Sequence, residues 1–301
     1  MIILTKLIQC VPNFSEGRNQ TIIEGLRSIA SSVPGVTLVD YSSDESHNRT
    51  VVTMVGTPEG VKTAALQLAK YAVEHIDLTK HTGEHPRMGA VDVIPFVPIK
   101  DVTMEDCIEL SKEVGQAIAE ELKLPVFLYE ESASKSTRQN LATVRKGQFE
   151  GMAKKMEKPE WAPDFGEPKP HPTAGVVGVC ARMPLIAFNV NLSTPNVDIA
   201  NNIAKIVRAS GGGLKYCKGI GVMLEDRNIA QVSMNMVNFE GTPLYRALEL
   251  IRAECKRYGV HIVGTELIGI SPAKALIDCA EYYLQLEAFD YSKQVLENHI
   301  L

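Results

Sequence analysis

The sequence predicts an α+β protein made of two split β-α-β-β-α-β units, with a cleft between them. Short β-branched runs alternate with segments of helical periodicity. The same order of elements occurs twice along the 301 residues, a length that suits two domains. We therefore expect an N-terminal subdomain over residues 1–178 and a C-terminal subdomain over residues 179–301.

The first unit opens with a short apolar strand that ends in a turn at residues 12–17. Thr57-Pro58 predicts a helix start, because threonine caps helices well and proline is tolerated in the first helical turn. The run from Val91 to Val97 is rich in β-branched residues, which favours a strand. The predicted strands are residues 6–11, 36–41, 49–56 and 91–97, and the predicted helices are residues 21–31 and 57–76.

The middle of the chain carries a long amphipathic helix at 103–122, a strand at 124–129 and a polar, partly helical stretch at 132–156. Residues 159–172 then hold five prolines among fourteen residues, together with Trp161, the only tryptophan. So many prolines exclude a regular helix or strand. We interpret this segment as a linker or a ligand-facing loop.

The element order then recurs in the C-terminal part of the chain. Thr242-Pro243 and Ser271-Pro272 repeat the pattern of a capping residue followed by proline. The predicted strands are residues 185–191, 220–224, 229–236 and 260–265, and the predicted helices are residues 197–209, 242–258 and 271–284.

Composition and charge limit the partners and the cellular location that we expect. The formal charge of -5 gives no reason to expect a nucleic-acid partner. No apolar run approaches the roughly 20 residues that a membrane-spanning helix needs, so no membrane partner is expected. The six cysteines form no Cys-x-x-Cys pair, which favours free thiols and a reducing, cytoplasmic location.

The densest group of reactive side chains precedes the strand at 91–97. His81, Glu84, His85 and Arg87 fall within seven residues, and an intervening glycine and proline exclude a regular helix. Catalytic groups are often found on such loops beside a rigid strand. A histidine near its ordinary pKa transfers protons at neutral pH. A histidine without chemical function is the alternative.

His81, Glu84 and His85 also spell the His-x-x-Glu-His order of one class of metallopeptidases. That motif needs a helix to turn both imidazoles to one side. Gly83 and Pro86 remove the helix. We therefore expect no metal site, and a metal-dependent hydrolase is the less favoured alternative.

Further polar residues lie near predicted strand ends, and each has a structural alternative. Arg49 and Arg87 offer planar guanidinium groups that pair with a carboxylate, either of a substrate or of a nearby aspartate. Asp92 interrupts an apolar strand and needs a partner if it is buried, for which Arg87 is a candidate. Asn13, Asp40 and Asn48 complete the set of candidate substrate-binding residues with the two arginines.

A basic stretch follows the strand at 124–129. Its members are Lys135, Arg138, Arg145 and Lys146. Such a run is usually a solvated helix face, and here it is also a candidate contact for a polyanionic ligand tail.

Six stretches together resemble the glutamate formimidoyltransferase family, the transferase part of formimidoyltransferase-cyclodeaminase. Their order and spacing follow the family over nearly the whole chain, and the chain lacks the length of a cyclodeaminase part. The stretches are Cys10 to Gly17, Asn48 to Val51, Gly83 to Ala90, Trp161 to Gly166, Leu185 to Leu192 and Ala230 to Ser233.

The resemblance implies a pair of ferredoxin-like subdomains. It implies a transferase that moves the formimino group from N-formimidoyl-L-glutamate to tetrahydrofolate, the co-substrate, in histidine breakdown. The family's catalytic histidine falls on His85. Its folate-binding stretch matches here at both ends but not in the middle, so the location carries over better than individual contacts. That stretch is Gly166, Glu167, Pro168, Lys169, Pro170, His171, Pro172, Thr173, Ala174 and Gly175.

Several alternatives stay open at this point. Formyl transfer between N-formylglutamate and a tetrahydrofolate differs from formimino transfer only by oxygen in place of nitrogen. A folate-binding protein without catalysis is a third class, beside the transferase and the metal-dependent hydrolase. A homodimer is one possible assembly, and a polyglutamylated folate is one possible form of the co-substrate.

Overall fold

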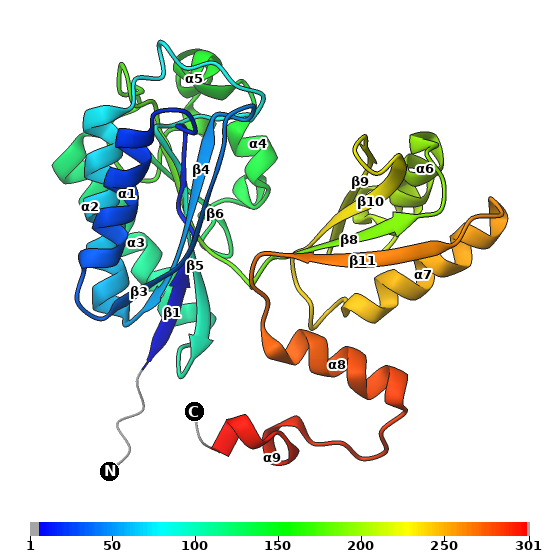
Figure 1. Cartoon of the computed structure of the whole chain (residues 1–301). Helices are drawn as coiled ribbons and strands as arrows, with labels where there is room; N and C mark the ends of the chain where they lie inside the picture. The colour runs from blue at the N-terminus through cyan, green and yellow to red at the C-terminus, as the bar shows by residue number, and fades with distance from the viewer. Residues whose placement is uncertain (1–5, 300–301) are drawn as a thin grey trace. The chain divides into compact units, whose positions relative to one another are not determined.

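The computed structural model describes residues 6–299. The chain forms two compact units, Met1–Arg182 and Met183–Leu301 (Figure 1). Each unit has its own sheet and its own core, which confirms the predicted two-part α+β organisation. The boundary expected at 178/179 falls inside β7 (Val177–Ala181), a strand of the first unit's sheet. The cleft expected between the units stays a prediction.

The first unit is built on one mixed sheet with the strand order β3-β4-β1/β2-β5-β7-β6. β1 and β2 lie in line between β4 and β5, and all pairings from β3 to β5 are antiparallel. β7 joins β5 and β6 through parallel pairing. The remaining strands are β1 (Leu7–Cys10), β2 (Asn13–Phe14), β3 (Val36–Asp44), β4 (Arg49–Gly56), β5 (Val91–Lys100) and β6 (Val126–Glu130).

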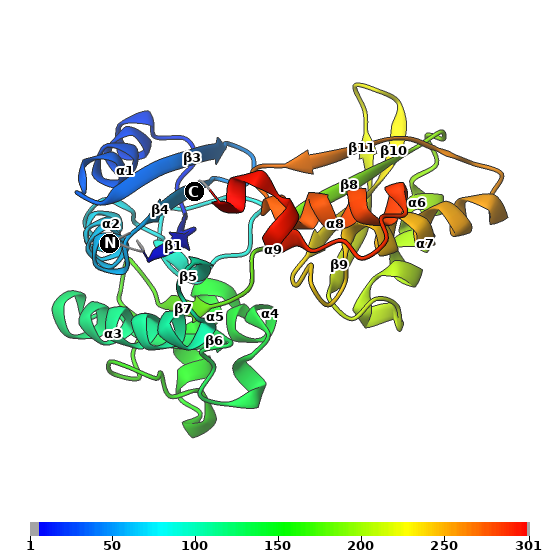
Figure 2. The ribbon, with the colours of Figure 1, turned by 90° about the horizontal axis from the view of Figure 1, so that it is seen from below.

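Helices cover both faces of this sheet (Figure 2). α1 (Gln20–Ser32), α2 (Pro58–His75) and α3 (Met104–Leu122) pack on one face and enclose the larger core. α4 (Leu141–Arg145) and α5 (Gln148–Met156) pack on the other face over a smaller core. Single 3-10 turns lie at Ser136–Arg138 and Pro159–Trp161.

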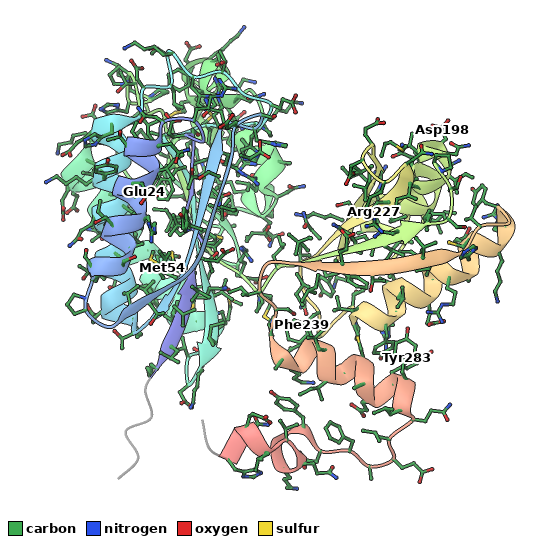
Figure 3. All side chains as sticks on the ribbon, in the orientation of Figure 1. Glu24, Met54, Asp198, Arg227, Phe239 and Tyr283 are labelled. Carbon is green, nitrogen blue, oxygen red and sulfur yellow. The ribbon has the colours of Figure 1, made fainter. Side chains whose placement is uncertain are left out.

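The second unit has a four-stranded antiparallel sheet with the order β11-β8-β10-β9. Its core lies between this sheet and the helices α6 and α7 and includes Phe239. Figure 3 labels Phe239 together with Met54, which belongs to the core of the first unit. The elements are β8 (Ile186–Leu192), α6 (Val197–Val207), β9 (Cys217–Leu224), β10 (Ile229–Met236), α7 (Leu244–Arg257), β11 (Ile262–Ile268), α8 (Ala273–Leu284) and α9 (Tyr291–Gln294), with 3-10 turns at Ala209–Gly211 and Leu296–His299.

One of the three predicted helix caps is confirmed and two are wrong. The Thr57 side chain accepts a hydrogen bond from the Gly60 amide at 3.2 Å, as expected for an N-cap. At the starts of α7 and α8 the extended cap residues are Pro243 and Pro272 themselves, without a side-chain cap bond. These helices therefore begin one residue later than a Thr-Pro or Ser-Pro signal suggests.

The six cysteines are free thiols, five of them buried. Among residues 6–299, none of the helices is long and apolar enough to cross a membrane.

Candidate active site

Three turns of the first unit meet where the chain enters β5. They are residues 15–19 after β2, residues 44–49 between β3 and β4, and residues 77–90 after α2. Asn48 links them, because its Oδ1 accepts from the Gly17 amide at 2.8 Å and its Nδ2 donates to Thr82 O at 3.0 Å. The Glu84 amide donates to Ser46 O at 3.1 Å. The loop with the two histidines is therefore tied to both neighbouring turns.

Two glycines allow this close approach. A Cβ atom on Gly17 would lie 2.3 Å from Asp44 O, and one on Gly83 would lie 2.5 Å from His47 O. Both distances are far below van der Waals contact with backbone atoms. A side chain at either position would push the turns apart and displace the histidine loop.

His85 projects from this loop with 17% of its side chain exposed. Its Nδ1 lies 3.4 Å from Nη1 of Arg49, the first residue of β4. Because a guanidinium can only donate, this contact assigns the lone pair to Nδ1 and the hydrogen to Nε2. Nε2 is buried without a hydrogen-bond partner in the part of the chain that the structure describes. It lies 4.0 Å from Oδ2 of Asp92, which is beyond hydrogen-bonding distance.

Asp92 is the buried carboxylate of the site, with 2% of its side chain exposed. Its Oδ1 accepts from the Met88 amide at 2.7 Å, and its Oδ2 accepts from Nη2 of Arg145 at 2.5 Å. The partner of Asp92 is therefore Arg145, at the end of α4, and not the candidate Arg87, which pairs with Glu150. A buried aspartate needs such a cation, because an unpaired charge is costly away from water.

Burial and positive charge set the protonation of this site. Burial, followed by the charges of Arg49 and Arg145, lowers the pKa of His85 from 6.5 to about 3. Burial and then Arg145 also lower the pKa of Arg49. Burial raises the pKa of Asp92, an effect that Arg145 and the Met88 amide oppose. The imidazole is therefore neutral but a weak base, so the expectation of a histidine near its ordinary pKa is wrong for this structure. The positive charges around it also attract anions.

The lowered pKa of His85 should weaken the folded protein in acid. The unfolded chain binds a proton there near pH 6.5, but the folded chain binds it only near pH 3. Stability therefore falls as the pH decreases from about 6.5 toward 3. The free energy of unfolding, measured with urea at about pH 7 and about pH 4.5, should fall less at the lower pH for His85→Gln than for the wild type. An equal or larger loss in the variant would contradict this assignment.

Arg87 connects the histidine loop to α5 through hydrogen bonds. Its Nη1 and Nη2 donate to the Glu150 carboxylate at 2.9 and 2.6 Å, and Nη1 also donates to Gln148 at 3.1 Å. Its Nε donates to Nδ1 of His81 at 3.1 Å, while Nε2 of His81 lies 2.9 Å from Asn48 O. All three guanidinium nitrogens are engaged, which favours a positioning role over the predicted substrate contact.

The other two candidate substrate residues lie on strands of the same sheet. Asn13 is half-buried on β2 opposite Val93, the neighbour of Asp92, and its Nδ2 donates to Val11 O at 2.9 Å. Asp40 is exposed on β3 opposite Thr53. The hydrogen bonds described above link His81 to Asn48 and Arg87, and His85 to Arg49. They connect neither Asn13 nor Asp40 to these residues.

The predicted folate stretch lines a groove of about 700 Å³ beside the C-terminal half of α3. Phe165 forms part of the wall and contacts the α3 surface at Gly115. His171 Nδ1 accepts from the Ala174 amide at 3.0 Å and closes the turn at the end of the stretch. The groove is lined by Gln116, Ala119, Glu120, Lys123, Phe165, Gly166, Glu167, Lys169, Pro170, His171 and Pro172.

The far end of this stretch is bonded to the chain on both sides of the histidine loop. The Leu78 amide donates to Thr173 O at 2.8 Å, and the Ala90 amide donates to Ala174 O at 2.9 Å. The Val176 amide donates to Met88 O at 3.0 Å. The stretch from Gly166 to Gly175 therefore runs from the groove to the two ends of the histidine loop.

Within residues 6–299, no group of three His, Cys, Asp or Glu side chains has the geometry to hold a metal ion. His81 and His85 do not face a common centre, since His81 contacts Asn48 and Arg87 while His85 contacts Arg49. The expected absence of a metal stays a prediction, which the metal content of a clean preparation tests.

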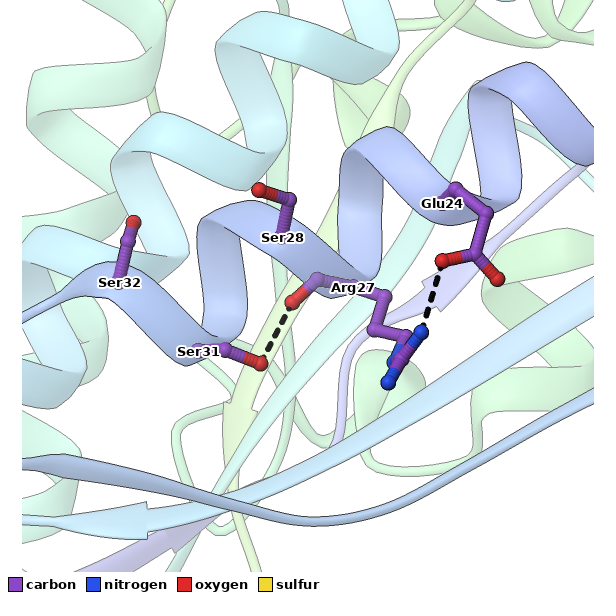
Figure 4. Close-up of a pocket in the computed structure, with 5 residues that line it drawn as sticks. All are labelled: Glu24, Arg27, Ser28, Ser31 and Ser32. Carbon is purple, nitrogen blue, oxygen red and sulfur yellow. Dashed lines mark hydrogen bonds and ion pairs between the residues drawn. The ribbon is translucent and has the colours of Figure 1, made fainter.

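A second hollow, of about 480 Å³, lies on the surface of α1 (Figure 4). All of its lining residues come from that single helix, and Arg27 is paired with Glu24 at 2.9 Å. Ser31 donates to Arg27 O at 2.9 Å. These groups satisfy one another, so this hollow has no feature of a catalytic site.

The basic stretch supplies a half-buried arginine and a buried one, neither of which was among the predicted site residues. Arg145 pairs with Asp92, and Arg138 has 1% of its side chain exposed. Lys135 and Lys146 are exposed, as a solvated face predicts. The buried Asp92 was the one sequence signal that a cation had to lie nearby.

Two family models cover the chain. The model described as the N-terminal subdomain of the formiminotransferase domain matches residues 7–182, and the one described as the formiminotransferase domain matches residues 187–299.

Similar proteins extend the comparison to whole chains. A glutamate formimidoyltransferase of Streptococcus pyogenes serotype M1 is 65% identical over 298 residues, which cover 99% of this chain and 100% of that protein. One from Thermoplasma acidophilum is 46% identical and covers 94% of each chain. The formimidoyltransferase-cyclodeaminase of Gallus gallus is 46% identical, covering 94% of this chain but 53% of that protein.

Proposed function

This chain belongs to the formiminotransferase family, and we propose that it is a glutamate formimidoyltransferase. It transfers the formimino group from N-formimidoyl-L-glutamate to tetrahydrofolate, giving 5-formimidoyltetrahydrofolate and L-glutamate, in histidine degradation. The observation that carries the proposal is the 65% identity, over the whole chain, to a protein named for this activity.

The chemistry needs one group that accepts a proton and later returns it. The folate amine attacks the formimino carbon as Arg49 turns from the imidazole to a donor carboxylate. The proton of the amine then passes to the freed lone pair on Nδ1 of His85 as the new carbon–nitrogen bond forms. The tetrahedral intermediate then collapses. His85 returns the proton to the glutamate nitrogen, whose bond to carbon breaks. A neutral imidazole with its lone pair on Nδ1 suits the first step.

The donor carries two carboxylates, and two arginines border His85. Arg49 lies 3.4 Å from the imidazole, and Arg145 reaches the same site through Asp92. Guanidinium groups hold carboxylates in a fixed orientation, and precise placement of two substrates supplies much of the rate. Arg49 is therefore favoured over Arg87 for the donor, with Asn13, Asp40 and Asn48 as further candidate contacts.

Folate is proposed to bind along Gly166–Gly175. The support is the groove beside α3 at one end of the stretch and the hydrogen bonds to Leu78 and Ala90 at the other. This path leads from a hollow large enough for a ligand to the two ends of the loop that carries His85.

The prolines of this stretch should lower the entropy that the segment loses when folate docks. Changing Pro168, Pro170 and Pro172 together to serine should raise the KM for tetrahydrofolate roughly tenfold, because each proline contributes about 0.4–1 kcal/mol of rigidity. Turnover with saturating folate should stay near the wild-type value. Pro34→Ser, in an exposed turn, is the matched control. An unchanged KM in the triple variant would place the folate elsewhere.

A paired-donor assay tests the reaction itself. Turnover of N-formimidoylglutamate and N-formylglutamate is measured with the same tetrahydrofolate, and the formimino donor should be preferred. Preference for the formyl donor would support the alternative reaction. Folate binding without turnover of either donor would indicate a folate-binding protein, and chelator-sensitive hydrolysis would indicate the metal-dependent hydrolase.

We also propose that each unit contains a ferredoxin-like subdomain. The support is that the strand order β3-β4-β1/β2-β5 in the first unit corresponds to β9-β10-β8-β11 in the second. The cytoplasmic location and the homodimer stay predictions, and light scattering tests the latter.

A further inference from the structure

Among the residues that the structure describes, one imidazole nitrogen of His85 has no hydrogen-bond partner, although a carboxylate lies close to it. Nε2 lies 4.0 Å from Oδ2 of Asp92, and that same oxygen accepts from Arg145 at 2.5 Å. A shift of about 1 Å would bring the carboxylate within hydrogen-bonding distance of Nε2. In the structure, the Asp92 carboxylate is thus paired with Arg145 and stops short of the imidazole.

We propose that Asp92 is a positioning residue for His85 and that Arg145 controls it. The inference rests on the proposed function, because the ligand that acts on Arg145 is a carboxylate of the donor. When this carboxylate pairs with Arg145, Oδ2 of Asp92 is released from Arg145. It then accepts a hydrogen bond from the Nε2–H of His85. That hydrogen stays on Nε2, and Nδ1 alone takes the proton from the folate amine and returns it to the leaving nitrogen.

The charges around His85 explain why the donor would activate the base. Among the described residues, the charges of Arg49 and Arg145 and the rings of His47 and His81 act on the imidazole, and Asp92 is the acidic side chain beside it. Two donor carboxylates would reverse the excess of positive charge, and a nearby opposite charge favours the protonated imidazole. The free protein holds a weak base, as the lowered pKa of His85 indicates. The donor complex would hold a stronger one.

A purely structural role for Asp92 is the competing explanation. Asp92 also accepts from the Met88 amide at 2.7 Å, so its loss would disturb the loop. Both roles predict reduced activity for Asp92→Asn, and activity alone does not separate them. The proton affinity of His85 does, because only the proposed role links it to the donor carboxylates.

The test is an NMR titration of the His85 ring, assigned with His85→Gln, with and without saturating L-glutamate. Glutamate is the product, and the two arginines should keep both of its bound carboxyl groups ionised, as in the donor, through the pH range of the titration. In the wild type, glutamate should raise the titration midpoint by about one pH unit or more, a tenfold gain in proton affinity. Asp92→Asn should lose at least half of this rise. Asp278→Asn, which removes an ion pair with Lys274 in α8, should behave like the wild type.

Arg145→Gln gives the opposite signature. Its His85 midpoint should already be raised in the free protein, and glutamate should add little. Its KM for the donor should rise about tenfold, whereas Asp92→Asn should lower kcat about 10²-fold with a nearly unchanged KM. If Asp92→Asn does not fold, the Arg145→Gln titration decides alone.

Two results would overturn the inference. They are an undiminished glutamate-induced rise in Asp92→Asn and an unchanged free midpoint in Arg145→Gln. Normal wild-type turnover together with either result rejects this inference and leaves the proposed function standing. A wild type that turns over no formimino donor rejects the proposed function instead.

Discussion

The His85→Ala variant should turn over about 10²–10⁴-fold more slowly than the wild type, the usual contribution of a positioned proton-transfer group. His85 is neutral in the free protein and holds a lone pair on Nδ1 next to Arg49. His81 cannot replace it, because both of its ring nitrogens are engaged, one with Arg87 and one with Asn48. The measurement is kcat with both substrates saturating, together with a thermal melt.

Two histidine variants control this experiment. His75→Ala removes an exposed imidazole that stacks on Tyr71 at the end of α2, and it should keep full turnover. His81→Ala should lose much less activity than His85→Ala, because His81 braces the loop without facing the reacting atoms. Near-native turnover of a folded His85→Ala variant would show that the proposed mechanism is wrong.

Periodicity was enough to predict the strands and helices that repeat in the two units, because each of those helices has one buried face. It was not enough for β7. All five residues of this strand are buried, since β5 and β6 flank it and helices cover the sheet on both sides. A strand buried on both faces lacks the polar alternation that marks a half-exposed one. The prolines of residues 159–172, which come shortly before this strand, also favoured an irregular segment in this part of the chain.

The site was predictable to the extent that its parts are local in sequence. His81, His85 and Arg87 lie on one loop, and Asn48-Arg49 belongs to a turn that its own polar residues indicate. Arg145 lies 53 residues from Asp92, and only the packing of α4 onto the sheet brings the two together. Its neighbours in sequence made it look like part of a solvated helix face.

Arg138 from the same basic stretch holds the segment that leads into the proposed folate stretch. Its Nη1 donates to Asp164 at 2.6 Å, and its Nη2 donates to Glu160 O and Ala162 O. Its guanidinium also lies 5.2 Å from the ring centre of Phe127. The Arg138 side chain is buried and that of Asp164 nearly so, with 1% and 9% exposed.

Arg138→Ala should destabilise the first unit by about 3–5 kcal/mol, because it leaves the Asp164 carboxylate buried without its cation. The melting temperature should fall on the order of 10 °C. Lys62→Ala removes a pair of similar length, 2.7 Å to Glu113, but on the surface, and should cost less than about 1 kcal/mol.

Arg138→Met combined with Asp164→Asn separates charge from packing. This double variant removes both charges of the pair and should recover part of the stability that Arg138→Ala loses. In the wild type the backbone amide of Leu128 donates to Asp164 at 2.8 Å, and the side-chain oxygen of Asn at position 164 can still accept that bond. Urea unfolding followed by the fluorescence of Trp161, whose ring centre lies 5.9 Å from the Arg138 guanidinium, reports on this region directly. If Arg138→Ala costs no more than Lys62→Ala, the ion pair does not hold the segment, and the prolines alone must order it.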